Sequence, residues 1–373
     1  MLSSDRITVY IGTYTRRESF VNGKGEGLSI YNLDPTSGKM TYAATVTGAG
    51  TVNPSFLTLS PDKSCLYAVN EISGDKDPHG TVSAFAIDPV TRQLRYLNQQ
   101  STHGLAPCHL SIEPEGRYCL VANYETGSVC VLPVGEDGSL GEATDTVQFY
   151  GSGPNPGRQE GPHAHMIVPG PDHGVILAVD LGTDRLMIFH LDMERGTLIP
   201  ADSPWTQMPP GSGPRHLAFH PHQPFIYVIN ELQSTVTVFH VLGMRGKFEA
   251  VQTLSTLPDD FKGQNLGAEI MAAPSGRHVY ASNRGDDSLL IYAVNQETGK
   301  LSVVGHESSQ GIGPRHFTMD PSGTLLLVAN QDTDTVVTFW IDQDSGMLSA
   351  TGQAAKVPTP VCLQLYDAGN QFD

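Results

Sequence analysis

The sequence predicts an all-β fold, a seven-bladed β-propeller with four antiparallel strands in each blade. The segment that begins Pro214-Arg215-His216 recurs at Pro314-Arg315-His316, and each copy continues through a Pro-containing turn into an apolar run that ends in Asn. Looser copies begin at residues 54, 107, 162, 268 and 360. A repeat of this length, with four short strands separated by Gly- and Pro-rich turns, is typical of a propeller blade.

The two ends of the chain are predicted to share one blade. The last copy, Pro360–Leu365, holds a single strand, whereas the N-terminus supplies three strand-like pieces, Ile7–Thr13, Leu28–Leu33 and Met40–Thr45. Pairing the C-terminal strand with the N-terminal strands closes the ring and leaves no free edge strand. We therefore expect a single propeller domain over residues 1–373, because an eighth blade would leave the N-terminal strands without a partner.

Composition restricts the partners and the compartment. The 22 basic and 39 acidic residues give a net charge of −17, and no run of Lys or Arg supplies the basic face that nucleic-acid binding requires. The N-terminus lacks the apolar core of a signal peptide, and no apolar run approaches the ~18 residues of a membrane span. The five cysteines show no metal-binding spacing and fit free thiols in a reducing compartment. We expect a cytoplasmic protein without nucleic-acid or membrane partners, either a monomer or a dimer.

Two positions of each repeat are expected to reach one mouth of the central channel: the second residue of the copy and the residue after its second strand. The first set is Ser55, Cys108, His163, Arg215, Glu269, Arg315 and Val361. The second set is Glu71, Tyr124, Leu181, Glu231, Arg284, Gln331 and Tyr14. A purely structural repeat would carry similar residues at these positions, and this repeat does not. The variation indicates a binding site at the mouth.

The candidate site combines arginines, carboxylates and histidines. Arginine binds phosphate or carboxylate through a planar fork of donors, and it can also hold the oxyanion that forms when a carbonyl is attacked. The candidate catalytic residues are His163, His165, Arg215, Glu231 and Arg284. The candidate substrate-binding residues are Arg315, Glu269, Gln331, Gln159, Glu71 and Tyr124, with Arg158 as a further candidate from the long loop that holds Gln159.

Several of these residues also have a structural interpretation. Strand alternation would turn His216 and His316 away from the channel into hydrogen-bonded, structural positions. The Arg–Glu pair in the repeat that begins at residue 214 could be a salt bridge between strands. His163 and His165 have no third ligand at a suitable spacing, so we predict no metal and no cofactor, with Ca²⁺ at the mouth as the alternative.

The repeated segments resemble a known family, the lactonase-type seven-bladed propellers, which include the bacterial propeller form of 6-phosphogluconolactonase and the fungal carboxymuconate cyclases. The similarity extends over essentially the whole chain. The matching segments are Gly213-Pro214-Arg215-His216 with Asn230-Glu231, Pro274-Ser275-Gly276-Arg277-His278 with Asn283-Arg284, and Pro314-Arg315-His316-Phe317 with Asn330-Gln331. The resemblance implies a lactone-handling site built from the histidines at 163–165, Arg215, Glu231 and Arg284.

The resemblance therefore favours an enzyme, a lactonase that hydrolyses the small anionic substrate 6-phosphogluconolactone to 6-phosphogluconate in the pentose phosphate pathway. We expect Arg315 and Arg284 to hold the phosphate or the ring oxygens, and Arg215 to polarise the carbonyl. Flanking arginines should depress the pKa of Glu231, so a histidine is the better base near neutral pH. The alternatives are a muconolactone-type cycloisomerase and a non-catalytic propeller that binds a partner.

Overall fold

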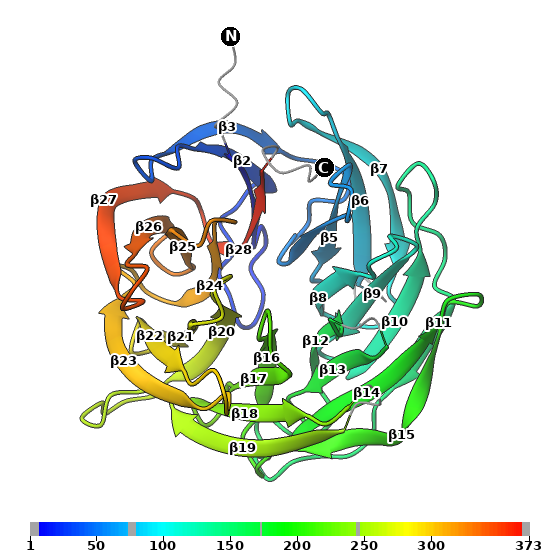
Figure 1. Ribbon diagram of the computed structural model, residues 1–373. Helices are drawn as coiled ribbons and strands as arrows, with labels where there is room; N and C mark the ends of the chain where they lie inside the picture. Colours follow the sequence, from blue (N-terminus) through cyan, green and yellow to red (C-terminus); the bar gives the residue numbers. More distant parts are fainter. Residues whose placement is uncertain (1–6, 74–79, 172–173, 244–246, 368–373) are drawn as a thin grey trace.

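Seven four-stranded antiparallel sheets stand around a central axis in the computed structural model (Figure 1). The structure describes residues 7–73, 80–171, 174–243 and 247–367. We number the sheets as blades in chain order, beginning with the blade that both ends of the chain share. The predicted all-β, seven-bladed propeller is confirmed. In the described part of the chain there is no helix that could cross a lipid bilayer.

In blades 2 to 7 the strands run from the axis to the rim in chain order, whereas in blade 1 the C-terminal strand is innermost. Blade 1 holds β28 (Pro360–Tyr366), β1 (Ile7–Thr13), β2 (Leu28–Leu33) and β3 (Met40–Val46). Blade 2 holds β4 (Leu57–Leu59), β5 (Cys65–Asn70), β6 (Thr81–Ile87) and β7 (Leu94–Ser101), and blade 3 holds β8 (Pro107–Ile112), β9 (Tyr118–Asn123), β10 (Ser128–Pro133) and β11 (Asp145–Gln148). Blade 4 holds β12 (Ala164–Pro169), β13 (Ile176–Asp180), β14 (Arg185–Asp192) and β15 (Thr197–Gln207). Blade 5 holds β16 (Pro214–Phe219), β17 (Phe225–Asn230), β18 (Thr235–Val241) and β19 (Phe248–Ser255). Blade 6 holds β20 (Leu266–Ala272), β21 (His278–Arg284), β22 (Ser288–Val294) and β23 (Leu301–Ser308), and blade 7 holds β24 (Pro314–Met319), β25 (Leu325–Asn330), β26 (Thr335–Ile341) and β27 (Leu348–Lys356).

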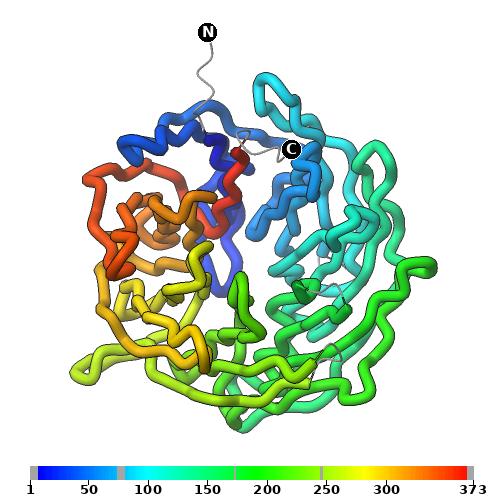
Figure 2. Tube along the Cα trace, in the orientation of Figure 1, coloured from blue at the N-terminus to red at the C-terminus, as the bar shows by residue number. Residues whose placement is uncertain are grey.

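The ring closes through blade 1, as the sequence predicts. The C-terminal strand β28 pairs antiparallel with β1, with Val9 opposite Leu365 and Ile11 opposite Leu363. Figure 2 shows the blue N-terminal trace and the red C-terminal trace side by side. Because β28 occupies the inner edge of β1, the N-terminal strands have no free edge towards the axis.

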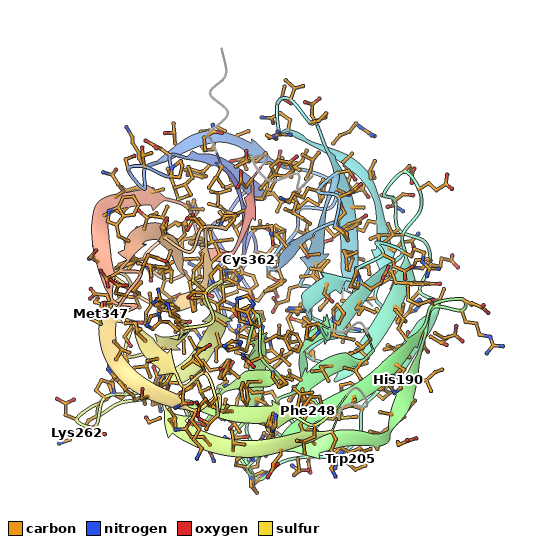
Figure 3. All side chains as sticks on the ribbon, in the orientation of Figure 1. His190, Trp205, Phe248, Lys262, Met347 and Cys362 are labelled. Atoms are coloured by element: carbon orange, nitrogen blue, oxygen red, sulfur yellow. The ribbon has the colours of Figure 1, made fainter. Side chains whose placement is uncertain are left out.

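The core lies between neighbouring blades. Alternate side chains of each strand face the next sheet, so that Ile11 of blade 1 packs in one cluster with Leu327 and Val336 of blade 7. In Figure 3, Cys362 of the innermost strand β28 lies near the axis and Trp205 of the outermost strand β15 lies at the rim. Each blade is thus held by two neighbours, and the loops at the ends of the inner strands are left to form the channel mouths.

The innermost strands carry a β-bulge near their first residues. The register shifts between Pro214 and His216 in β16, between Pro314 and His316 in β24, and at the same place in β8 and β12. A bulge sets two residues against one on the neighbouring strand and so breaks the strict alternation of side chains. Arg215 and His216 can then both face the axis.

The bulge overturns the expectation that His216 and His316 point away from the channel. Rings from five blades meet on the axis: Phe56 lies 4.3 Å from His109 and 5.7 Å from His316, centroid to centroid, and His165 lies 5.0 Å from His216. Such contacts across the ring are possible only if these side chains point inward. We call Phe56, His109, His165, His216 and His316 the axial cluster.

The closing strand should carry a measurable part of the stability. Leu363 of β28 is 2% exposed and packs with Val9 and Ile11. Leu363→Ala should therefore lower the free energy of unfolding by about 2–5 kcal/mol, measured by urea denaturation. The matched control is Val303→Ala on the outer strand β23, where the side chain is 54% exposed and the change should stay below about 1 kcal/mol. Equal stability of Leu363→Ala and the wild type would contradict closure by β28.

Candidate active site

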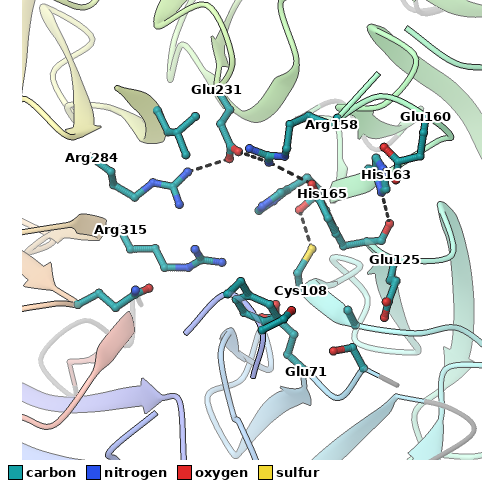
Figure 4. A pocket seen from close by; sticks show the side chains of 18 residues that line it. Glu71, Cys108, Glu125, Arg158, Glu160, His163, His165, Glu231, Arg284 and Arg315 are labelled. Carbon is teal, nitrogen blue, oxygen red and sulfur yellow. Dashed lines mark hydrogen bonds and ion pairs between the residues drawn. The ribbon is translucent and has the colours of Figure 1, made fainter. Parts of the chain in front are cut away.

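A cavity of about 570 Å³ opens at one mouth of the channel, lined by the ends of the inner strands and the loops beside them. Figure 4 shows it from close by. The structure brings most of the predicted site residues to this cavity. Those that line it are His163, His165, Glu231, Arg284, Arg315, Gln331, Glu71 and Tyr124.

Glu231 is the centre of one wall. It directly follows β17, is 3% exposed, and its backbone N–H donates to the carbonyl oxygen of Gly213 across the hairpin at 2.6 Å. Three guanidinium groups surround its carboxylate. Arg158 Nη2 lies 2.5 Å from Oε1, and Arg284 Nη2 and Arg215 Nε lie 2.8 and 3.2 Å from Oε2. This is more than the single salt bridge between strands that the repeat alone would allow.

The arginines keep Glu231 ionised. Burial raises the pKa of the carboxyl, but Arg284, Arg158 and Arg215 outweigh the burial and hold the pKa at about 2. The depression that the sequence predicts is confirmed. A carboxylate with so low a pKa is a weak base at neutral pH, so Glu231 is suited to orient cations rather than to accept a proton from water.

Arg215 lies behind Glu231 and does not line the cavity. Its side chain is 3% exposed, and Nη1 donates to the carbonyl oxygen of Ala268 at 2.6 Å. Burial and the neighbouring Arg284 and Arg315 lower its pKa to about 10, which leaves it protonated at neutral pH. The geometry fits a residue that fixes Glu231.

The two histidines of blade 4 differ in their surroundings. His163 Nδ1 lies 3.0 Å from the carbonyl oxygen of Tyr124, which can only accept, so Nδ1 carries the hydrogen and Nε2 faces Glu160 Oε1 at 3.1 Å. The His163 ring is stacked on the Tyr124 ring at 4.6 Å. His165 is buried, and burial, with Arg215 and His216, lowers its pKa well below the usual value. His165 is therefore neutral at neutral pH.

The opposite wall holds Glu71, Tyr14 and Arg315. Glu71 directly follows β5 and Tyr14 directly follows β1, the equivalent position of blade 1. The Tyr14 hydroxyl donates to Glu71 Oε2 at 2.8 Å and accepts from Arg315 Nη2 at 3.0 Å. Figure 4 shows Glu71 and Glu231 on opposite sides of the cavity. The cavity thus has a carboxyl on each wall, in different electrostatic surroundings.

The long loop before β12 contributes Arg158 to the cavity, and not Gln159, which the sequence analysis had favoured. Gln159 is fully buried inside the loop, where Nε2 donates to Leu181 O and to Asp184 Oδ1, both at 2.8 Å. It does not line the cavity, so its position is that of a structural anchor for the loop. The neighbouring Arg158 reaches the cavity and also donates to the Tyr124 hydroxyl at 3.1 Å.

Glu269 lies apart from this cavity. With His216 and His316 it lines a second cavity of about 460 Å³. His216 Nδ1 lies 3.0 Å from both carboxylate oxygens of Glu269. The register of β20 shifts between Gly267 and Ile270, which places Glu269 deeper along the strand than its equivalents in other blades. Within the described ranges, no group of three or more His, Cys, Asp or Glu side chains is arranged to hold a metal ion.

Several residues at the cavity were not among the sequence candidates: Phe20 and Glu160 line it, and the buried Tyr14 forms hydrogen bonds with the lining residues Glu71 and Arg315. Tyr14 occupies an expected mouth position, but a tyrosine gave no charge signal in the repeat. Phe20 comes from the loop between β1 and β2, lines the cavity and contacts the Tyr14 ring edge-on at 5.6 Å. Nothing in the repeat could have indicated Phe20, because the loop has no equivalent in the other blades.

The Glu231 cluster should make stability depend on acid pH. The pKa of Glu231 falls from an ordinary 4.5 to about 2 on folding, so ionised Glu231 contributes about 3 kcal/mol above the unfolded pKa. This contribution is lost as the pH falls towards the folded pKa. Glu231→Gln should therefore lose less stability than the wild type between these two pH values, measured by denaturation at a series of pH values.

The control for this experiment is Glu115→Gln, which removes a carboxylate that is 65% exposed. It should keep the acid dependence of the wild type. If Glu231→Gln also kept the wild-type dependence of stability on acid pH, the conclusion that Glu231 is ionised by its contact with three arginines would be contradicted.

Comparison with known proteins agrees with this architecture. The sequence model described as "Lactonase, 7-bladed beta-propeller" matches residues 8–365. The chain is 36% identical over 311 residues to the 6-phosphogluconolactonase of Bacillus subtilis strain 168, covering 83% of this chain and 84% of that protein. It is 31% identical over 297 residues to the 6-phosphogluconolactonase of Klebsiella pneumoniae strain 342, covering 80% and 82%. The solved structure of the periplasmic gluconolactonase PpgL of Pseudomonas aeruginosa superposes with a TM-score of 0.89 at 34% identity, over 96% of this chain and 99% of that one. The chain belongs to the seven-bladed β-propeller lactonase family.

Proposed function

We propose that this protein is a lactonase that hydrolyses 6-phosphogluconolactone to 6-phosphogluconate. The observation that supports the proposal most is that the arginines of one cavity differ in whether they form an ion pair with a carboxylate. Arg158 and Arg284 are paired with Glu231, whereas no carboxylate of the described residues forms an ion pair with Arg315. Arg315 therefore keeps its charge for an anion. The relatives named 6-phosphogluconolactonase support the same substrate.

Arg315 is the proposed site for the phosphate. Its guanidinium is held by the Tyr14 hydroxyl and lies 5.5 Å from the centroid of the Tyr14 ring. A planar guanidinium fixed in this manner can direct its other N–H groups at phosphate oxygens. The net charge of −17 would otherwise repel such a substrate, so a local cation is required.

The lactone carbonyl is proposed to lie against the Glu231 wall. Arg284 lines the cavity, and two contacts fix its guanidinium, to Glu231 Oε2 and to the carbonyl oxygen of Gly267 at 3.2 Å. A fixed cation in a largely buried site stabilises the oxyanion that forms when water attacks. Arg215, which the sequence suggested for this role, instead fixes Glu231 from behind.

His163 is the proposed general base. The hydrogen bond from Nδ1 to the backbone leaves Nε2 as the proton acceptor. The 3.1 Å contact between Nε2 and Glu160 Oε1 needs a hydrogen between the two atoms, so it corresponds to the ring after proton transfer. Glu160, whose side chain is 60% exposed, has to point away while Nε2 accepts a proton from the attacking water, and it then stabilises the resulting imidazolium. Burial and Arg215 lower the pKa of His165 well below its usual value, which makes His165 a weak base.

A second substrate follows from one comparison, because the structurally similar PpgL is named a gluconolactonase. Gluconolactone lacks the phosphate and would not need Arg315. The pentose phosphate pathway and the cytoplasm are the setting that we propose for a phosphorylated lactone.

The role of Arg315 can be measured by comparing the two lactones. Arg315→Ala should lower kcat/KM for 6-phosphogluconolactone by about 10- to 100-fold, the loss expected for hydrogen bonds to a charged group. It should lower kcat/KM for gluconolactone by a much smaller factor, because that substrate has no phosphate for Arg315 to bind. The assay follows lactone opening at constant pH and subtracts the spontaneous rate.

The control is Arg195→Ala, which removes an arginine that is 81% exposed on the outer hairpin of blade 4. It should behave as the wild type with both lactones. An equal loss on both lactones in Arg315→Ala would contradict the phosphate site. If the wild type accelerated neither lactone, the proposed function itself would be wrong.

A further inference from the structure

We propose that Glu71 is a catalytic residue, the acid that protonates the ring oxygen as the lactone opens. The proposal rests on the proposed function, since it assigns a role within the same cavity. The wall that holds Glu71 lies opposite the Glu231 cluster (Figure 4). The roles proposed for Arg315, Arg284 and His163 in the reaction do not involve this carboxyl.

The hydrogen bonds beside Glu71 have only one possible direction. A guanidinium can only donate, so the Tyr14 hydroxyl accepts from Arg315 Nη2 and must direct its own hydrogen elsewhere. That hydrogen goes to Glu71 Oε2 at 2.8 Å. Oε2 is thereby occupied as an acceptor, which favours Oε1 as the oxygen that carries the proton of the neutral carboxyl. Tyr14 thus favours one oxygen of Glu71 as the donor.

The surroundings of Glu71 favour its neutral form. It is 6% exposed, and burial raises the pKa of its carboxyl in spite of the opposing effects of Arg315, the Ser55 and Tyr14 hydroxyls, and Arg215. The Cys108 thiol is a further titratable neighbour, and its own pKa is raised by burial and by Glu71. The pKa values of the two carboxyls are therefore shifted in opposite directions: that of Glu71 is raised, which favours the neutral acid, and that of Glu231 is lowered, which favours the carboxylate. Such a division between two carboxyls in one cavity is typical of acid catalysis.

The order of atoms in the substrate places the ring oxygen beside Glu71. In 6-phosphogluconolactone the ring oxygen lies between the carbonyl carbon and the carbon that carries the phosphomethyl group. With the phosphate on Arg315 and the carbonyl on Arg284, the ring oxygen falls between them. Arg315 is linked to Glu71 through the single hydroxyl of Tyr14.

The step balances without any further reactant. His163 takes one proton from water as the hydroxide adds to the carbonyl carbon. The bond from that carbon to the ring oxygen then breaks, its electron pair stays on the oxygen, and the oxygen takes the proton of Glu71. Exchange with solvent returns a proton to Glu71 and removes one from His163. One water is consumed and the open hydroxy acid is released.

The test compares Glu71→Gln with the wild type. Glutamine keeps the shape and a hydrogen-bond donor but has no proton to transfer. We expect kcat for 6-phosphogluconolactone to fall roughly 10²- to 10⁴-fold with little change in KM, since the interaction is needed only in the transition state. Wild-type kcat, corrected for the spontaneous rate, should also fall as the pH rises through the raised pKa of Glu71, and Glu71→Gln should lack that fall. Tyr14→Phe keeps the acid but loses its orientation, and its kcat should fall by less.

A readout that does not depend on activity is the infrared difference spectrum of wild type minus Glu71→Gln, recorded at a pH just above 4.5, the ordinary value for this carboxyl. It should contain the C=O stretch of a protonated carboxyl. Glu115→Gln, which neutralises a carboxylate that is 65% exposed and does not line the cavity, is the matched control and should keep the wild-type kcat and pH profile. Wild-type kcat in Glu71→Gln, or a raised KM with unchanged kcat, would overturn the proposal while the lactonase function stood. A wild type that opens no lactone would refute the function, and the infrared signal would still report on the proton.

Discussion

The carboxylate of Glu231, enclosed by Arg158, Arg215 and Arg284, is the interaction on which the site depends. Four charges at short range are expensive to bury, and such a cluster is not a source of net stability unless its geometry is fixed. The closed ring supplies that geometry, because the four residues come from a loop and from three strand ends in two adjoining blades. Without the carboxylate, the three guanidinium groups would repel one another and the cavity would lose its shape.

The concentration of charge around Glu231 on one wall leaves the opposite wall with a different electrostatic character. Arg315 lies outside the cluster and stays available for an anion, and Glu71 faces it through Tyr14 in surroundings that favour the neutral acid. The axial cluster contributes to both cavities: His165 lines the first, and Phe56, His216 and His316 line the one that holds Glu269. A small anionic lactone with its carbonyl at one end and its phosphate at the other suits this polarity.

The repeat made the ring and most of the site predictable, because turns rich in Pro and Gly and strands of alternating polarity mark the blades. It also gave the register that identifies Arg215, Glu231, Arg284 and Arg315. The bulge in the inner strands was not visible, since alternation assumes a regular strand, and so His216 and His316 were assigned to the wrong face. The side-chain directions in a loop cannot be deduced from a repeat of alternating residues, and for this reason the buried Gln159 was preferred over Arg158.

The most direct test of this account is the rate of 6-phosphogluconolactone opening by Glu231→Gln beside the wild type, with folding verified for both. If the carboxylate organises the arginines that stabilise the oxyanion, the wild type accelerates the reaction, and kcat/KM of the variant falls by at least about 100-fold, as for loss of an oxyanion donor. A folded Glu231→Gln protein with the activity of the wild type would contradict the account.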